Sequence, residues 1–251
     1  STLENDVPTA YEEADHGVGT LAHGIDAAGN TNVIGYSNTL SGVKISLQLN
    51  PDVSTQVLNQ AGGTSGGGKT GSNWNAALSG AVPGVDGLTL AASYVPQGSD
   101  DESQTAIGVT YTGLVDGLTL KYGRGDDNDG TGSLSNAEAT SYSATYAYGP
   151  MTFAYSDHDY DHETVTSSQD ATSMKLSYTV SDAISVSYGT EEINSKATAA
   201  VQDAEYSKIS ASYTSGGMTV TVTSQEADNM NYTTASTMDQ DYWSLGLSFA
   251  F

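Results

Sequence analysis

The chain has 251 residues, 37% of them hydrophobic, and no run approaches the roughly 18 consecutive apolar residues of a transmembrane helix. Its 30 acidic residues against 7 basic ones give a net charge of −23, which argues against nucleic acid, because Lys and Arg are needed to neutralise phosphates. The absence of cysteine excludes disulfides and thiol chemistry and is compatible with an oxidising periplasm or cell surface.

In chain order, residues 1–30 are rich in acidic residues and Gly and are predicted to form an acidic loop segment. Six pairs of alternating runs follow, each pair joined by a tight turn that contains Gly, Asp or Pro. A last run at 241–251 brings the predicted number of strands to thirteen. The paired runs are 32–37 with 43–49, 74–81 with 88–95, 104–112 with 118–124, 140–148 with 151–156, 172–180 with 183–190, and 206–213 with 218–225.

Long polar connections separate these hairpins, so short turns alternate strictly with long loops. This regularity is unusual for soluble sandwiches and typical of outer-membrane barrels. The long connections are 50–73, 96–103, 125–139, 157–171, 191–205 and 226–240.

Each predicted strand has one apolar face and one small polar face. In the run 43–49, Val, Ile and Leu side chains alternate with Lys44, Ser46 and Gln48. No segment with a helical period is left to cover the apolar faces, so they contact either a second β-layer or lipid. All thirty carboxylates are expected outside the strand interiors, since a charge on the lipid face costs about 2–4 kcal/mol at mid-membrane.

The last run keeps its apolar face to the end of the chain. Trp243, Leu245, Leu247, Phe249 and Phe251 share one parity, and Ser, Gly and Ala occupy the other. Tyr residues recur near the predicted strand ends, where amphipathic rings form girdles at the headgroup level. Both patterns favour lipid as the partner of the apolar face.

The aromatic terminal strand, the alternation of short turns and long loops, and the hairpin NTNVIGYSNTLSGVKISLQLNPD after an acidic segment resemble a Gram-negative outer-membrane diffusion porin over about residues 30–251. The resemblance implies an all-β, antiparallel transmembrane barrel at 31–251. It also implies that 1–30 includes the constriction loop. Porins have an even number of strands, so the barrel is expected to total sixteen, or eighteen, with the N-terminal strands absent or on another chain. A strand at 17–25 would instead allow closure at fourteen.

The same resemblance implies a water-filled channel in the outer membrane for passive diffusion of small hydrophilic solutes. The implied partners are lipid, lipopolysaccharide, the barrel-assembly machinery and two further copies of the chain in a homotrimer. Trp243, Phe249 and Phe251 would form the assembly signal of the terminal strand.

Four lysines fall on the polar parity of their strands and are predicted to line the pore: Lys44, Lys121, Lys175 and Lys208. The resemblance implies that acidic groups on an inward loop face them, and the candidates are Glu4, Asp6, Glu12, Glu13 and Asp15. A rim and constriction lined by carboxylates concentrate cations, so cation preference is expected, with the lysines opposing it.

No resident cofactor is expected. Asp157, Asp159 and Asp161 share one parity beside two histidines, and hard cations such as Ca²⁺ bind oxygen ligands. The run GDDNDG at 125–130 is also rich in oxygen, but it lacks the spacing of a calcium loop. Solvated acidic loops are the competing interpretation of both runs.

The sequence has no Cys nucleophile and no HExxH, so the protein is expected not to be an enzyme. Three alternatives to a diffusion channel stay open at this point. They are the translocator barrel of an autotransporter, an outer-membrane barrel hydrolase, and a soluble β-solenoid or adhesin.

Overall fold

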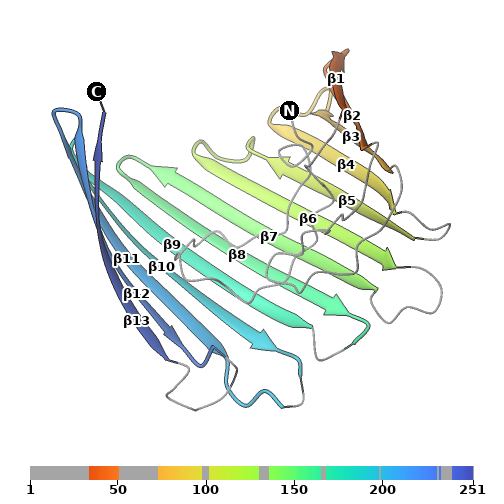
Figure 1. Ribbon diagram of the computed structural model, residues 1–251. Helices are drawn as coiled ribbons and strands as arrows, with labels where there is room; N and C mark the ends of the chain where they lie inside the picture. The colour runs from red at the N-terminus through yellow and green to blue at the C-terminus, as the bar shows by residue number, and fades with distance from the viewer. Residues whose placement is uncertain are drawn as a thin grey trace.

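A computed structural model describes residues 34–50, 73–97, 102–129, 136–164, 168–197, 199–230, 232 and 239–250. Within these ranges the chain forms one curved antiparallel sheet of thirteen strands, ordered along the sheet as they are in the sequence (Figure 1). β1 and β13 lie at its two edges. The expected all-β antiparallel fold and the expected thirteen strands are confirmed.

The strands lengthen from the N-terminal to the C-terminal half of the sheet. Their bounds are β1 Ile34–Leu40, β2 Val43–Asn50, β3 Asn73–Ala81, β4 Leu88–Gln97, β5 Glu102–Tyr111, β6 Leu118–Asp129, β7 Ala137–Tyr148, β8 Met151–His162, β9 Gln169–Ser181, β10 Ile184–Ser195, β11 Ala204–Ser215, β12 Met218–Asp228 and β13 Gln240–Phe249.

Tight turns fix the register of the hairpins at one end of the sheet. Ser41 and Gly42 join β1 to β2 with φ values of 52° and 85°, and Gly216 and Gly217 join β11 to β12 with 55° and 85°. Two consecutive positive φ values define the primed turn that matches the twist of paired strands. In both hairpins the flanking residues then pair directly, as Ser215 does with Met218. We call this end of the sheet the short-turn end and the opposite end the long-connection end.

The two faces of the sheet differ as the alternation predicts. We call the face with the large apolar side chains the outward face and the face with the small polar side chains the inward face. In β9 the side chains of Met174, Leu176, Tyr178 and Val180 are exposed on the outward face. Ser173, Lys175 and Ser177 occupy the inward face of the same strand. Register extends this division across the sheet, because paired residues in an antiparallel sheet share a face.

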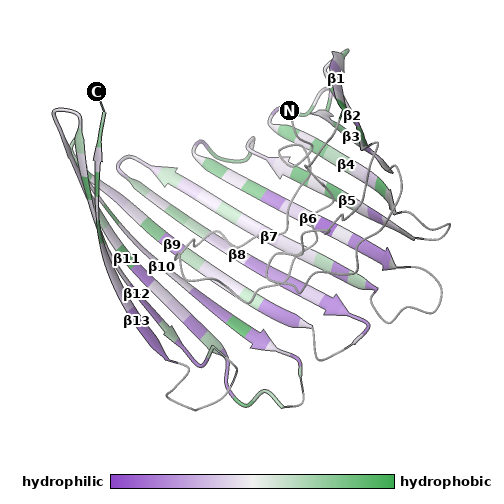
Figure 2. Cartoon of the chain, viewed as in Figure 1, coloured by the Kyte–Doolittle hydropathy of each residue, from purple (hydrophilic) through white to green (hydrophobic). Residues whose placement is uncertain are grey.

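The expectation that all carboxylates lie outside the strands is wrong. β6, β8, β10 and β12 run several residues further than predicted at the long-connection end and include Asp126, Asp157, Glu191 and Glu226. The cost of a charge applies only within the hydrocarbon layer, and these strands continue beyond the apolar part of the outward face. Figure 2 shows hydrophilic residues at these ends of β6 and β8.

Outward aromatic side chains mark the border between the apolar and acidic zones. Trp74 packs against Tyr94 with ring centroids 5.6 Å apart, and Tyr122 against Tyr142 at 5.1 Å. Tyr142 pairs directly with Asp157, so on β7 and β8 the first outward carboxylate lies beside this ring. Aromatic rings at this border are typical of a membrane interface.

Several sequence predictions fall outside the described residues. They concern the acidic segment 1–30, the optional strand at 17–25 and the terminal Phe251. Among the residues that the structure does describe, no helix is long and apolar enough to cross a membrane.

Candidate functional site

The inward face of the sheet is a wall of small and hydrogen-bonding side chains. One row of paired residues crosses seven strands and consists of Thr110, Lys121, Ser143, Ser156, Ser173, Glu191 and Tyr206. Hydroxyl, amino and carboxylate groups at these positions replace the Leu, Tyr and Val of the outward face. Such groups bind water and dissolved solutes where they are exposed, whereas Ser156, Ser173, Glu191 and Tyr206 of this row are buried.

All four predicted lysines lie on the inward face, at different depths. Lys44 is one residue from the short-turn end of β2, Lys121 three residues from that of β6, Lys175 six from that of β9 and Lys208 seven from that of β11. At about 3.3 Å per residue, these positions lie roughly 3, 10, 20 and 23 Å along their strands. The lysines therefore lie at different distances from the short-turn end and do not form one ring across the inward face.

Lys175 and Lys208 form a pair. Both residues pair directly with Gly189 of β10, from opposite sides, so the two ammonium groups flank a position that has no side chain. Their Cα atoms are separated by two strand spacings, about 9–10 Å. The neighbours on the far sides are uncharged: Ala154 pairs with Lys175, and Gln225 pairs with Lys208.

Glu191 adds a carboxylate to this part of the wall. Its side chain is only 2% exposed and accepts a hydrogen bond of 2.8 Å from the Ser173 hydroxyl. Because it lies two residues beyond Gly189, it is diagonal to both Lys175 and Lys208, a relationship that places Cβ atoms about 7–8 Å apart. Two cations and one buried anion thus share a small area of the wall.

The prediction from sequence missed Glu191 and a second inward carboxylate, Asp127 of β6, which is 6% exposed. Both were assigned to long connections because they follow the last apolar residues of their strands. The period-two pattern could have found them, since Gly189, Glu191 and Ile193 continue one parity.

The candidate metal ligands Asp157, Asp159 and Asp161 lie on the outward face of β8. Lys196 bridges two of them, with Nζ 2.9 Å from Asp159 Oδ2 and 2.7 Å from Asp161 Oδ1, and it also lies 3.1 Å from Asp170 Oδ1. Burial lowers the pKa of Lys196, but the hydrogen bonds to the three carboxylates raise it above its ordinary value overall. A Ca²⁺ site at these aspartates stays a prediction, and the ion would compete with this ammonium group.

Arg124 plays a similar part on β6. Its guanidinium lies on the outward face, 2.7 Å from Glu138 Oε2 and 3.3 Å from Asp126 Oδ1. The strand predicted from sequence at 118–124 ends at Arg124. The residue is within β6 because that strand extends to Asp129.

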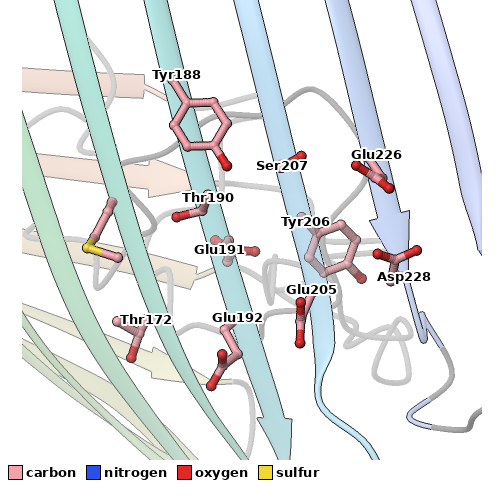
Figure 3. Close-up of a pocket in the computed structure, with 11 residues that line it drawn as sticks. Thr172, Tyr188, Thr190, Glu191, Glu192, Glu205, Tyr206, Ser207, Glu226 and Asp228 are labelled. Atoms are coloured by element: carbon pink, nitrogen blue, oxygen red, sulfur yellow. The ribbon is translucent and has the colours of Figure 1, made fainter.

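A third group of acidic residues surrounds a hollow of about 410 Å³ on β9–β12 (Figure 3). Glu192 pairs directly with Glu205, and Glu205 with Asp228, so three carboxylates form one row across β10–β12. Register places all three on the outward face. Like charges that lie directly opposite repel one another, so cations in the surrounding solution stabilise this row.

The acidic constriction candidates Glu4, Asp6, Glu12, Glu13 and Asp15 lie outside the described residues. Of the residues proposed as an assembly signal, Trp243 and Phe249 lie on the outward face of β13, exposed by 73% and 57%. The described site therefore consists of the four lysines, the two inward carboxylates and the hydroxyl-rich wall between them.

A single antiparallel sheet with an apolar outward face, an aromatic border and a hydrophilic inward face defines an outer-membrane β-barrel channel. The family model of Gram-negative porins matches residues 47–196, more than half of the chain. The chain therefore belongs to the Gram-negative porin family. Its location is the outer membrane, and its fold and family support a channel.

Solved structures agree with this fold. A porin refined at 1.8 Å resolution matches with a TM-score of 0.58 and 14% identity, over 87% of this chain and 91% of that one. OccK1 (OpdK) of Pseudomonas aeruginosa matches with a TM-score of 0.63 and 13% identity, over 86% and 68%. OmpT of Vibrio cholerae matches with a TM-score of 0.55 and 12% identity, over 90% and 82%. No curated protein sequence matches the chain.

Proposed function

We propose that this channel admits small hydrophilic solutes and ions by passive diffusion and prefers cations. The observation that carries the proposal is the inward wall, where hydroxyl, amino and carboxylate side chains form a row across β5–β11. The cation preference rests on the excess of 30 acidic residues over 7 basic ones and on the carboxylates at the long-connection ends of β6–β12. Carboxylates at a pore mouth with low-dielectric walls raise the local cation concentration.

The inward lysines oppose this preference locally. Lys175 and Lys208 lie near the middle of the wall, and Lys44 and Lys121 lie nearer the short-turn end. We assign the opposing negative charge to Glu4, Asp6, Glu12, Glu13 and Asp15. Such an arrangement would give a transverse field that orients dipolar solutes as they pass.

The proposed assembly is a homotrimer in contact with lipid and lipopolysaccharide through the outward face. The apolar alternation of β13, with Trp243, Phe249 and Phe251, would be the signal read by the barrel-assembly machinery. Ca²⁺ is the proposed ion at Asp157, Asp159 and Asp161, although no group of three or more acidic or histidine side chains among the described residues is arranged to hold a metal ion.

Conductance across planar lipid bilayers tests the channel function. We expect discrete conductance steps in KCl, with three equal closures from one trimer. In asymmetric KCl, a reversal potential shifted towards the K⁺ equilibrium potential would support cation preference. Negligible conductance from protein that shows heat-modifiable gel migration would refute the channel, and an anion-selective reversal potential would refute only the charge preference.

A further inference from the structure

An apolar patch lies where the inward wall should be wet. Five inward side chains at the long-connection ends of β9–β12 form a buried cluster. Their exposed fractions are 5% or less, and three of them are 0%. An apolar surface facing the lumen would be exposed to water unless something covered it. The residues of the cluster are Ala171, Ile193, Ala204, Tyr206 and Ala227.

The start of the connection from β12 to β13 covers this cluster. Met230 and Tyr232 pack against it, so the chain turns inward over the wall after Asp228. Burial raises the pKa of Tyr232 to about 12, with a hydrogen bond from Gln169 lowering it and the nearby Glu191 raising it further. Tyr206 of the cluster pairs directly with Glu191, so Tyr232 lies against the same part of the wall as the buried carboxylate.

Hydrogen bonds from three separate parts of the chain hold Tyr232 in place. The Gln169 side-chain amide of β9 donates to its hydroxyl at 2.8 Å. The backbone N–H groups of Val201 and Gln202, between β10 and β11, donate to its carbonyl at 3.0 and 3.3 Å. Its own N–H donates to the carbonyl of Asn229 at 2.6 Å.

The backbone conformation of this turn supports a fixed position. Asn229 and Tyr232 have φ values of 55° and 57°, in the left-handed region that residues with a Cβ rarely occupy. Such conformations persist only where surrounding contacts over-determine them, and they cluster at functional sites.

We propose that Tyr232 is a size-determining residue of the channel mouth. It anchors Asn229, Met230 and its own ring against the inward wall of β9–β12, where they narrow the entrance and exclude the larger solutes. This inference rests on the proposed channel function. It differs from the constriction expected at residues 1–30, because it assigns part of the narrowing to the connection before β13.

The first experiment compares the exclusion limit of Tyr232→Ala with that of the wild-type protein. Proteoliposome swelling in neutral sugars of increasing size measures the limit, and planar bilayers measure the conductance. We expect Tyr232→Ala to admit larger sugars and to conduct more, and Tyr232→Phe, which keeps the ring, to change less. Tyr148→Ala, at an outward position 72% exposed, is the matched control and should leave the limit unchanged.

The second experiment measures the cover directly. The chain has no cysteine, so Ala204→Cys introduces one thiol within the cluster that Met230 and Tyr232 pack against, at a position that is 0% exposed. A charged, water-soluble thiol reagent should modify this thiol slowly. In Ala204→Cys/Tyr232→Ala the rate should rise about tenfold, because the local opening that exposes the site is easier. Ser212→Cys is the control, because this inward position is distant from the cluster. Its thiol should react at the same rate with Tyr232 present and in Tyr232→Ala.

Heat-modifiable gel migration identifies the variants that have folded. A conducting wild-type protein with an unchanged exclusion limit in folded Tyr232→Ala overturns this inference alone. Equal modification rates of the Ala204→Cys thiol in the two backgrounds overturn it as well. A wild-type protein that does not conduct overturns the proposed function and this inference with it.

Discussion

Lys175 and Lys208 project from the same face of the sheet because both pair directly with Gly189. Nothing larger than a hydrogen atom stands between the two side chains on β10. Their charges therefore act on the same stretch of the lumen, about 20 Å along their strands from the short turns.

Replacing this pair should strengthen the proposed cation preference. In Lys175→Gln/Lys208→Gln, two positive charges leave the wall while Glu191 stays, so the reversal potential in asymmetric KCl should shift towards the K⁺ equilibrium potential. Arg124→Gln is the control, because it removes a positive charge from the outward face. An equal shift in both variants would mean that net charge, and not position in the lumen, sets selectivity.

Neighbouring positions on β9 should tolerate charge very differently. Leu176 is exposed on the outward face, and Ser177 lies on the inward face. We expect Leu176→Arg to lower the free energy of unfolding from lipid vesicles by about 2–4 kcal/mol and Ser177→Arg to lower it by much less. Urea titration monitored by tryptophan fluorescence measures both. Similar losses would show that the outward face is not in lipid.

The glycines of two short turns should differ in their tolerance of a methyl group. Gly42 has φ +85° and open space around the added Cβ, so Gly42→Ala should cost about 1–2 kcal/mol from backbone conformation alone. Gly117 has φ +79°, and an added Cβ there would collide with the carbonyl oxygen of Ala147. Gly117→Ala should therefore cost clearly more in the same unfolding titration. Equal losses of unfolding free energy in Gly42→Ala and Gly117→Ala would show that the backbone of Gly117 does not closely approach the carbonyl oxygen of Ala147.

Lys196 should stabilise the long-connection end of β8–β10 in a manner that depends on salt. Lys196→Met leaves Asp159, Asp161 and Asp170 without their shared cation. This substitution should lower the free energy of unfolding by about 1 kcal/mol, and by less in 1 M salt. Lys196→Arg should retain most of this stability. A difference between wild type and Lys196→Met that is insensitive to salt would point to lost packing instead.

The pH dependence of this contribution follows from the raised pKa of Lys196. A lysine whose folded-state pKa exceeds its unfolded value contributes fully below the unfolded value, about 10.4, and loses the contribution as the pH rises through the folded value. The difference in unfolding free energy between wild type and Lys196→Met should therefore stay constant from pH 7 to about pH 10 and shrink above it.

The hairpins could be predicted from sequence because each carries a local signal at both ends. The turn at Gly216 and Gly217 follows an alternating run and precedes another, and the structure places β11 and β12 there. The long-connection ends were placed too early because Asp157 and Glu226 were taken as loop residues. Hydropathy detects where a strand leaves lipid, whereas pairing continues as long as the backbone hydrogen bonds do.

The inward cover could not be predicted from sequence. Gln169 and Tyr232 are separated by 63 residues, and no periodic pattern links them. The apolar cluster beneath Tyr232 combines four strands, each of which contributes one or two small or apolar residues to an otherwise polar parity. Only the register of β9–β12 brings those residues together.

Two-residue turns set the alignment of β1 with β2 and of β11 with β12. The loops at the long-connection end therefore do not determine that alignment. Lengthening a surface loop adds only a slowly growing entropic cost. Foreign peptides, such as epitopes or affinity tags, can therefore be grafted between β2 and β3 without disturbing the alignment of β1 with β2.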